Sequence, residues 1–424
     1  MKTYRIVGTV FTILFTAVVA LLLFQNCGGG SMPATDSAAN EPSEQQSPTP
    51  TPSKEIPSIT KTDFMTGLNS PWDMAFLADG TMFFTEKCRG LSVRLTSGTV
   101  RRLFGTTGSA VVASDFFCEG QTGMHGVALD PNFATNRTLF VYMPSTLLNP
   151  KTNRVVRLVV DAGYTTVSQR TDIITNIAYK NLGNNWGDPG SHSGGRIRFG
   201  PDGFLYVTTG DNHNGTIPQS PTVLGGKVLR VDRNGAAAPG NNPPAGFDAR
   251  VYTYGHRNVQ GVSFRPGTGR VFISEHGPDH SDEVTQLTAG GNGGWDPVPA
   301  PGVSCQDNYC GYISNRPDGK LTSMTDLEKF PNAMRPSWVL ADAEGLGPCE
   351  FLRGQQWKAW DGRLVVGIMG GKRMEILELG QNGNMVGITR ANLPSNRIRS
   401  TVQGPDGSLY VAIDEGAIWK VTPQ

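Results

Sequence analysis

Apolar and polar residues follow a repeated phrase along residues 60–424. An apolar stretch leads into a turn rich in Pro, Asp, Asn and Gly, and a strand of alternating apolar residues follows the turn. In the Pro-Asp-Gly turns, Pro presets φ, Asp caps the turn and Gly takes positive φ, which is typical of a β-hairpin. Six copies are present, at residues 72–86, 127–142, 197–211, 262–275, 360–366 and 402–414.

The repeat predicts an all-β fold. Two-strand phrases that recur with spacers of unequal length are typical of propeller blades that carry insertions. No window shows a sustained helical period, which disfavours a helical enzyme fold. We therefore expect residues 59–424 to form a six-bladed β-propeller with four-stranded antiparallel blades. Loops from several blades meet at one face of such a propeller, so a site there draws residues from distant parts of the sequence.

The first residues have the pattern of an export signal. Lys2 and Arg5 precede an apolar run at residues 6–24, and Cys27 follows the run. A lone Cys after such a run predicts a lipoprotein-type signal over residues 1–27, with Cys27 as the lipidated residue. The two residues before Cys27 are not small, as they usually are in such signals. The run is also long enough to span a membrane, so a retained transmembrane anchor is the alternative.

Residues 28–58 are mostly Ser, Thr, Pro, Ala, Glu and Gln, with almost nothing apolar. Such a segment cannot bury enough surface to offset the entropy lost on ordering, so it predicts a disordered tether. Together with the signal, it predicts an exported protein on the periplasmic or cell-surface side, tethered to a membrane through Cys27.

Composition narrows the possible partners. The 53 Gly and 29 Pro agree with many turns and short strands. Lys and Arg number 37 against 36 Asp and Glu, so the net charge is +1. The chain has no basic excess to hold a phosphate backbone, and nucleic acid is therefore not an expected partner.

Five cysteines follow Cys27, and none stands in the Cys-x-x-Cys spacing of a zinc or redox site. In an oxidising compartment some of them should pair. Cys305 with Cys310 would close a short loop, and Cys88 with Cys118 would join neighbouring segments. The sequence does not fix these pairings, and an odd thiol is left over in either case.

His192 and Asp211 are the candidate catalytic pair. His192 lies in a Gly/Ser-rich loop just before the phrase at residues 197–211, and Asp211 ends that phrase. A hairpin between them would return Asp211 beside His192. A carboxylate there fixes the tautomer of the imidazole and stabilises its protonated form, as a general base requires. The alternative is a structural histidine that only hydrogen-bonds within its loop.

Several motifs occur in the order found in one known family. They are Gly120-Gln-Thr-Gly-Met-His-Gly126, His192-Ser-Gly-Gly-Arg196, Gly210-Asp211, Tyr254-Gly-His-Arg-Asn-Val-Gln-Gly261, Glu275-His-Gly-Pro-Asp-His-Ser-Asp-Glu283, Gly290-Gly-Asn-Gly-Gly-Trp295 and Asn396-Arg-Ile-Arg399. With them, the chain resembles the soluble quinoprotein glucose dehydrogenase and aldose sugar dehydrogenase family over residues 64–424. The fold of that family is a six-bladed propeller, in agreement with the repeat.

The resemblance implies an oxidoreductase that oxidises the C1 hydroxyl of aldose sugars to the lactone. Its cofactors would be pyrroloquinoline quinone (PQQ) and Ca²⁺, and an external acceptor would take the electrons. His192 matches the base that takes the hydroxyl proton while hydride passes to the quinone, and Asp211 matches its orienting carboxylate. Arg257 matches the Arg beside the C5 oxygen of the quinone, where charge develops.

The resemblance also implies the residues that bind the cofactor. Gln121 and Asn258 match polar contacts to PQQ. Arg397 and Arg399 match residues that clamp its carboxylates, a task that suits the guanidinium fork.

Calcium and one departure from the family complete the expected site. The main-chain carbonyls of Gly277 and Pro278 match the ligands of the calcium ion that bridges to the quinone, and hard oxygen donors suit Ca²⁺. Gly370 stands where the family often has a Lys that pairs with the cofactor. Lys372 lies two residues further, so on a strand it would share that face and take the role. His125 occupies a position that is usually aliphatic.

Two other functions stay open. A propeller of the same fold can lose cofactor binding and serve as a surface binding module, since fold alone does not prove chemistry. Gly370 favours that alternative, while the retained His192, Asp211 and Arg257 favour the enzyme. A calcium-dependent lactonase would need acidic and Asn ligands that converge on the channel, and the sequence shows no such set.

Overall fold

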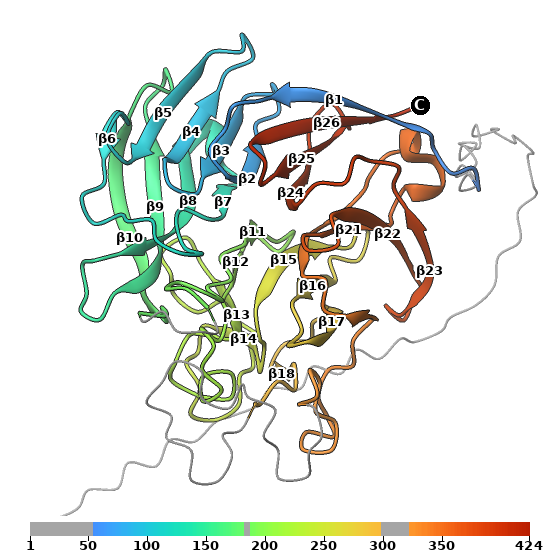
Figure 1. The fold of residues 1–424 in the computed structure, drawn as a ribbon. Coiled ribbons are helices and arrows are strands. Elements are labelled where there is room, and N and C mark those ends of the chain that lie inside the picture. Colours follow the sequence, from blue (N-terminus) through green and yellow to red (C-terminus); the bar gives the residue numbers. More distant parts are fainter. Residues whose placement is uncertain (1–53, 182–186, 298–321) are drawn as a thin grey trace, which may run out of the picture. The chain divides into compact units, whose positions relative to one another are not determined.

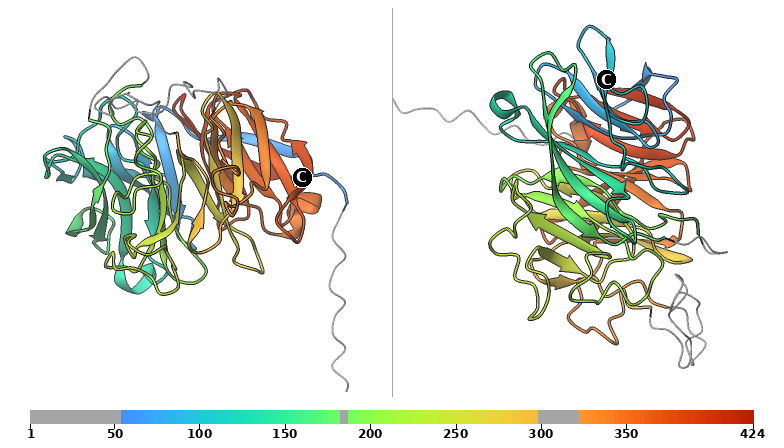
Figure 2. Two further views of the ribbon diagram at one scale, coloured as in Figure 1. Left: turned by 90° about the horizontal axis from the view of Figure 1, so that it is seen from below. Right: turned by 90° about the vertical axis from the view of Figure 1, so that its left-hand side faces the viewer.

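The computed structural model of the protein describes residues 54–181, 187–297 and 322–424. Strands dominate these residues, and six sheets surround a common centre as the blades of a propeller (Figure 1). Figure 2 shows the same blades from two further sides. The predicted six-bladed β-propeller is confirmed.

We number the blades 1 to 6 in chain order of their innermost strands. Blade 1 has β2 (Pro71–Phe76), β3 (Met82–Glu86), β4 (Gly90–Arg94), β5 (Val100–Gly105) and β6 (Val111–Val112). Blade 2 has β7 (Val127–Leu129), β8 (Thr138–Ser145), β9 (Thr152–Val160) and β10 (Val167–Ile177). Blade 3 has β11 (Ile197–Phe199), β12 (Leu205–Thr208), β13 (Lys227–Val231), β14 (Val251–Tyr254) and β18 (Gly291–Asn292).

The other three blades follow the same order from the inside outwards. Blade 4 has β15 (Val259–Phe264), β16 (Val271–Glu275), β17 (His280–Gln286) and β19 (Trp338–Asp342). Blade 5 has β20 (Leu346–Phe351), β21 (Leu364–Ile368), β22 (Arg373–Leu379) and β23 (Met385–Arg390). Blade 6 has β24 (Ile398–Gln403), β25 (Leu409–Ile413), β26 (Ala417–Pro423) and β1 (Ile59–Met65). The helix α1 (Phe133–Asn136) and the 3-10 helix η1 (Gln355–Trp360) lie in connections.

Hydrogen bonds between the two ends of the described chain close the propeller. Strand β1 pairs antiparallel with β26, from Ile59 opposite Pro423 to Met65 opposite Ile418. Blade 6 is therefore built from both ends of the chain, and neighbouring innermost strands contact one another in a closed ring. Because the ring is closed, each of the six blades has a neighbouring blade on both faces.

The predicted phrases correspond to the inner hairpins of the blades. Five of the six copies coincide with the two innermost strands of a blade. The copy at residues 360–366 coincides only with the end of η1 and with β21, because η1 is inserted between β20 and β21. Two blades also differ from the predicted four strands, since β6 and β18 add short parallel strands to blades 1 and 3.

The hydrophobic core is divided among the contacts between blades. Among the described residues, one large cluster of buried apolar side chains lies between each pair of neighbouring blades. A small further cluster joins Trp295 and Met324. Adjacent residues of a strand point to opposite faces, so Phe83 packs toward blade 2 and Phe84 toward blade 6. Both faces of each blade are buried, which explains the nearly continuous apolar runs of the inner strands.

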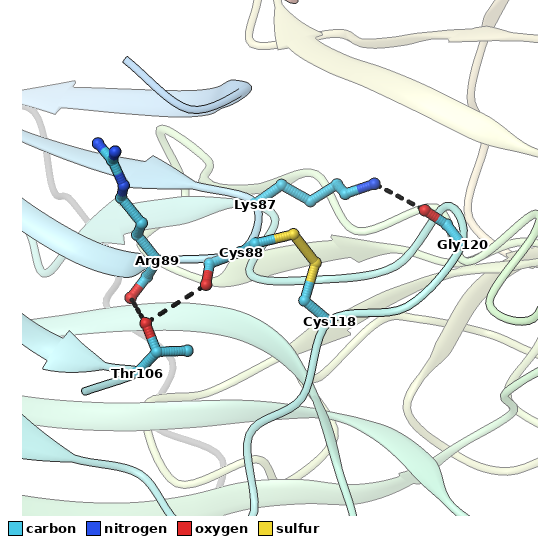
Figure 3. Close-up of a disulfide and its surroundings, with 6 residues drawn as sticks. All are labelled: Lys87, Cys88, Arg89, Thr106, Cys118 and Gly120. Carbon is cyan, nitrogen blue, oxygen red and sulfur yellow. Dashed lines mark hydrogen bonds between the residues drawn. A yellow bond between two sulfur atoms is a disulfide. The ribbon is translucent and has the colours of Figure 1, made fainter. Parts of the chain in front are cut away.

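Cys88 and Cys118 form a disulfide, one of the pairings that the sequence left open (Figure 3). Cys349 is a buried thiol, and burial raises its pKa to about 12. Cys27, Cys305 and Cys310, with their predicted roles, lie outside the described residues.

The predicted signal and most of the predicted tether also lie outside the described residues. The described end of the tether contacts the propeller, since the carbonyl of Glu55 accepts a hydrogen bond from Ala359 N at 2.9 Å and that of Ser58 from Gln424 N at 2.8 Å. Among the described residues, no helix has both the length and the apolar character needed to cross a membrane.

Candidate active site

A cavity of about 360 Å³ lies where loops of all six blades meet. Its lining residues stand before or at the start of an innermost strand, or just after the second strand of a blade. These two places lie at the same face, because the two strands are antiparallel. The lining residues are Ser70, Trp72, Lys87, Gly120, Gln121, His125, Gly190, His192, Ser193, Gly194, Asn258, Gln260, His276, Met369, Arg397, Arg399 and Asp414.

Five of the predicted site residues line this cavity, namely Gln121, His192, Asn258, Arg397 and Arg399. Asp211 and Arg257 lie directly behind the lining, because each hydrogen-bonds to a lining residue. Residues that are distant in the sequence thus meet at one face, as the propeller predicts.

The predicted pair of His192 and Asp211 is brought together. Hairpin β11–β12 returns the chain, and His192 Nδ1 lies 2.8 Å from Asp211 Oδ1. His192 has a φ of 52°, which a residue other than glycine rarely adopts. Both side chains are buried, with His192 7% and Asp211 0% exposed.

Further donors hold the Asp211 carboxylate. The backbone N–H of His213 donates to Asp211 Oδ1 at 3.0 Å, and Trp295 Nε1 donates to Oδ2 at 2.8 Å. The Asp211 N–H donates in turn to the carbonyl of Arg257 at 2.8 Å. Both carboxylate oxygens are therefore engaged, which fixes the plane in which Asp211 meets the imidazole.

His192 is a neutral imidazole at neutral pH. Burial lowers the pKa of its ring well below the usual value, and the positive charge of Arg257 adds to this effect. Because Asp211 accepts at Nδ1, the favoured tautomer carries its proton there, and Nε2 is the basic nitrogen. A neutral base beside a carboxylate can take up a proton and have the new charge compensated.

A second histidine packs against the first. The ring centroids of His192 and His213 are 3.7 Å apart, with an angle of 56° between the planes. His213 Nδ1 lies 3.1 Å from the ammonium of Lys180, which also donates to the Gly187 carbonyl at 3.0 Å. His213 thus supports the His192 ring from the side, with both rings buried.

Arg257 and Asn258 connect blade 4 to this pair. Arg257 Nη1 donates to the carbonyl of His276 at 3.0 Å, and its guanidinium lies 5.8 Å from the ring centroid of Trp295. Asn258 Oδ1 accepts from the Gly194 N–H at 3.2 Å, in the loop that carries His192. These contacts fix the relative positions of the His192 loop and the predicted residues of blade 4.

Arg397 and Arg399 share one carboxylate at the opposite wall. Arg397 Nε donates to Asp414 Oδ2 at 2.8 Å, and Arg399 donates to both oxygens of Asp414, at 2.8 and 2.6 Å. Burial acts to raise the pKa of Asp414, but the charge of Arg399 and its hydrogen bonds lower it on balance. Two positive charges against one negative charge make this wall suited to an anion.

The predicted calcium ligands lie in a tight turn after β16. The N–H of Gly277 donates to Asp282 Oδ1 at 2.8 Å, and Asp282 Oδ2 accepts from Leu346 N at 3.1 Å. A Cβ at residue 277 would come within 2.0 Å of the His280 carbonyl oxygen, so the turn requires glycine there. Within the described ranges, no three His, Cys, Asp or Glu side chains gather to hold a metal, and main-chain carbonyls are the expected donors.

The prediction that Lys372 shares a strand face with residue 370 is wrong. Both residues lie in the turn between β21 and β22, where Lys372 has a φ of 49° and is exposed. Lys372 is absent from the lining of the cavity. Gly370 itself has no room for a side chain, because a Cβ there would lie 2.5 Å from the Glu344 carbonyl oxygen.

The sequence profile described as "Glucose / Sorbosone dehydrogenase" matches residues 68–420, which is nearly the whole propeller. The chain belongs to the glucose/sorbosone dehydrogenase family. The family resemblance and the fold that it implied are thereby confirmed.

Two relatives by sequence and one solved structure resemble this chain. An aldose sugar dehydrogenase from Escherichia coli is 28% identical over 84% of this chain and 91% of the relative. The quinoprotein glucose dehydrogenase B from Acinetobacter calcoaceticus is 27% identical over 58% of this chain and 53% of the relative. The PQQ-bound aldose sugar dehydrogenase of Streptomyces coelicolor is similar in fold, with a TM-score of 0.66 at 23% identity over 87% of this chain and 100% of that chain.

Sequence reasoning missed several residues at the site of this family member. Trp295 ends a motif, but nothing in the motif shows that its indole donates to Asp211. Trp72 lines the cavity and stacks on His125 at 4.5 Å between ring centroids, so the unusual histidine fills a place between aromatic rings. Lys87 lines the cavity from blade 1. The one sequence signal for this is its position directly after Glu86, the acidic residue that ends β3.

Proposed function

We propose that this protein is a PQQ- and calcium-dependent dehydrogenase that oxidises aldose sugars at C1 to the lactone. The observation that carries the proposal is the 2.8 Å contact between His192 Nδ1 and Asp211 Oδ1 at the wall of the cavity. Family membership supports a sugar as the substrate. The protein acts on the small sugar molecule and passes electrons to an external acceptor.

His192 is the general base of the proposed reaction. Its Nε2 takes the proton of the C1 hydroxyl, the C1–H bond breaks with its electron pair leaving as hydride, and the C1–O bond becomes a carbonyl. Asp211 stabilises the imidazolium that forms, and Arg257 adds positive charge beside the reacting atoms. When bound, PQQ supplies the acceptor for the hydride.

The side chains of the cavity fit an anionic cofactor with several carboxylates. Arg397 and Arg399 offer N–H groups in the fork geometry that carboxylates accept, and Asp414 neutralises only one of the two charges. Gln121 and Asn258 line the same cavity and supply polar contacts. The donor set thus has both the charge and the hydrogen-bonding capacity for PQQ.

Calcium is the second proposed cofactor, held by the main-chain carbonyls of Gly277 and Pro278. The turn that Asp282 stabilises follows directly after His276, a lining residue of the cavity, and this position supports the placement. We expect the apoprotein to bind PQQ only when Ca²⁺ is present. Fluorescence titration with PQQ in Ca²⁺ and in a strong chelator measures this, and equal binding in both would remove the metal from the site.

Reconstitution tests the whole proposal. Purified apoprotein receives PQQ and Ca²⁺, and reduction of a redox dye is followed with a panel of aldoses, ketoses and sugar alcohols. Dye reduction by aldoses alone is the expected result. Tight PQQ binding without any dye reduction would indicate a binding module of the same fold, and no PQQ binding would overturn the proposed cofactor.

We also propose that the protein is exported and tethered to a membrane through a lipid on Cys27. The apolar run before Cys27 and the polar segment after it support this placement. Cys27→Ala should prevent lipid attachment, which mass spectrometry of the mature protein detects. A membrane-bound mature protein that still begins at Met1 would support a retained transmembrane anchor instead.

A further inference from the structure

A third cation lines the cavity, and it comes from a different blade than the arginine pair. Lys87 follows β3 of blade 1, whereas Arg397 and Arg399 stand at the start of blade 6. The lysine position of blade 5 is unavailable in this chain, because Gly370 has no space for a side chain and Lys372 does not line the cavity. Lys87 is thus the one lysine among the described lining residues.

The backbone of Lys87 is fixed by several independent contacts. Its N–H donates to the Ser70 carbonyl at 3.0 Å, and its carbonyl accepts from Met124 N at 2.9 Å. The next residue, Cys88, is joined covalently to Cys118, at the start of the loop that carries Gln121 (Figure 3). These contacts fix the position from which the Lys87 side chain starts, so no backbone order has to be gained there on binding.

The side chain of Lys87 extends along that loop toward its tip. Its ammonium donates to the Gly120 carbonyl at 2.6 Å, as Figure 3 shows. A Cβ at residue 123 would lie 2.1 Å from the Lys87 carbonyl oxygen and 2.6 Å from Lys87 Cγ, so both the backbone and the stem of Lys87 pack closely against Gly123. An ammonium has three N–H groups, and the described hydrogen bonds of Lys87 use one of them.

Lys87 and Arg399 act on the same part of the cavity. Burial lowers the pKa of the Lys87 ammonium and the charge of Arg399 lowers it further, while the charges of Asp414 and Asp188 act in the opposite direction. Burial also lowers the pKa of His125 to about 3, with the charges of Arg399 and Lys87 acting in the same direction. The chain thus gathers like charges around a neutral histidine, an arrangement that a bound anion would relieve.

We propose that Lys87 binds a carboxylate of the quinone cofactor, in the role that a lysine in blade 5 would otherwise have. The inference rests on the proposed function. The charges agree with it, since Lys87, Arg397 and Arg399 give the cavity three positive side chains against the single Asp414. PQQ is a tricarboxylate, so a third cation from the blade next to the arginine pair engages an acid group that the pair leaves free.

The test compares the PQQ affinity of the full-length wild-type protein with that of Lys87→Met, which keeps most of the length of the side chain but removes its charge. Affinity is measured by fluorescence titration with Ca²⁺ present and no sugar, so that it is independent of turnover. We expect Lys87→Met to bind PQQ about 10- to 100-fold more weakly, the effect of losing a hydrogen bond to a charged group. Lys87→Arg should recover most of the affinity.

Two controls separate charge recognition from damage to the fold. Lys420→Met removes a lysine of β26 that pairs with Asp406 and lies outside the cavity lining, and it should leave PQQ affinity unchanged. The trimethyl ester of PQQ has no carboxylates, so Lys87→Met should bind the ester as well as the wild-type protein does.

The outcomes distinguish the two proposals. If the wild-type protein binds no PQQ, the proposed function fails. If it binds PQQ and Lys87→Met binds equally well, Lys87 has no role toward the cofactor. An acidic sugar is the other possible source of a carboxylate. In that case Lys87→Met would leave PQQ affinity unchanged and raise the KM for a uronic acid far more than the KM for the neutral aldose.

Discussion

Two buried aspartates, Asp73 and Asp211, are both 0% exposed but have different partners. Asp73 lies on β2, where Arg196 approaches its carboxylate to 2.7 Å and Arg198 to 2.6 Å. Ser400 Oγ and the backbone N–H of Val127 donate to it as well. The Asp73 carboxylate therefore joins the inner parts of four blades around the centre of the propeller.

The ionisation of Asp73 is settled by fixed charges. Burial acts to raise the pKa of its carboxyl, but the charges of Arg196 and Arg198 and their hydrogen bonds lower the pKa to about 2. An arginine stays charged under all ordinary conditions, so this ion pair has one state. Asp73, Arg196 and Arg198 can hold blades together, but none of them exchanges a proton at ordinary pH.

Asp211 faces a partner that can change its charge. His192 is neutral, because burial and the charge of Arg257 lower its pKa. The carboxylate is therefore poised to stabilise a positive charge that appears only when His192 takes a proton. Equal burial and hydrogen-bonding thus do not separate a structural aspartate from the aspartate that we propose acts in catalysis. The difference lies in whether the partner titrates and reaches the cavity.

The largest expected effect is the loss of turnover when His192, the titrating partner of Asp211, is removed. His192→Ala should lower kcat by about 10² to 10⁴-fold, the usual cost of losing a general base. PQQ affinity should stay near normal, since the arginine pair lies at another wall. Steady-state kinetics under saturating PQQ and Ca²⁺ measure this, with thermal melts as the control. Near wild-type turnover in a folded His192→Ala protein would make His192 a loop stabiliser.

Removing the structural carboxylate should act on stability. Asp73→Ala leaves the buried Arg196 and the half-buried Arg198 without their anion, and breaking a buried pair costs about 3 to 5 kcal/mol. Urea unfolding followed by tryptophan fluorescence measures the change in the free energy of unfolding. Any Asp73→Ala protein that remains folded should keep kcat within a few-fold of wild type. A specific loss of kcat without loss of stability would give Asp73 a part in the chemistry.

Asp211→Asn should have an intermediate effect on rate. The amide removes the charge that stabilises imidazolium, so kcat should fall about 10- to 100-fold, less than in His192→Ala. An NH₂ group placed at Oδ2 would also meet the indole N–H of Trp295, which donates there now. Adding Trp295→Phe removes this clash of donors and should not restore the rate. Recovery of rate would mean that the geometry, and not the charge of Asp211, limits turnover.

The fold and the His192–Asp211 pair could be predicted because both depend on neighbours along the chain. The turn chemistry marks the inner hairpins, and one hairpin returns Asp211 to His192. The pairing of β1 with β26 could not be predicted, because an alternating pattern indicates a strand but does not indicate which strand it pairs with. The parallel strands β6 and β18 are too short for any pattern.

The missed and mistaken residues of the site depend on contacts between blades or on a turn. Trp295 reaches Asp211, and Lys87 reaches the Gly120 carbonyl, across segments that share no local pattern. Counting two residues from Gly370 predicts the same strand face for Lys372, because side chains alternate between the faces of a strand. The chain turns at residues 369–372, so this alternation does not apply there. At turns and at contacts between blades, the direction of a side chain depends on packing against distant segments, which the local sequence pattern does not indicate.

The smallest expected effect is the response of Asp73 to acid. Its folded pKa of about 2 lies below the ordinary 3.8, so its contribution to stability is fully present above 3.8 and is lost as pH falls toward 2. By pH 3 the loss should amount to about 1 kcal/mol. Asp73→Asn cannot ionise, so the stability difference between wild type and Asp73→Asn should shrink by that amount between pH 5 and pH 3. Urea unfolding of both proteins at the two pH values measures the difference. A difference that stays constant would show that the arginines do not hold Asp73 in its ionised form, and the contrast with Asp211 would then have to rest on geometry alone.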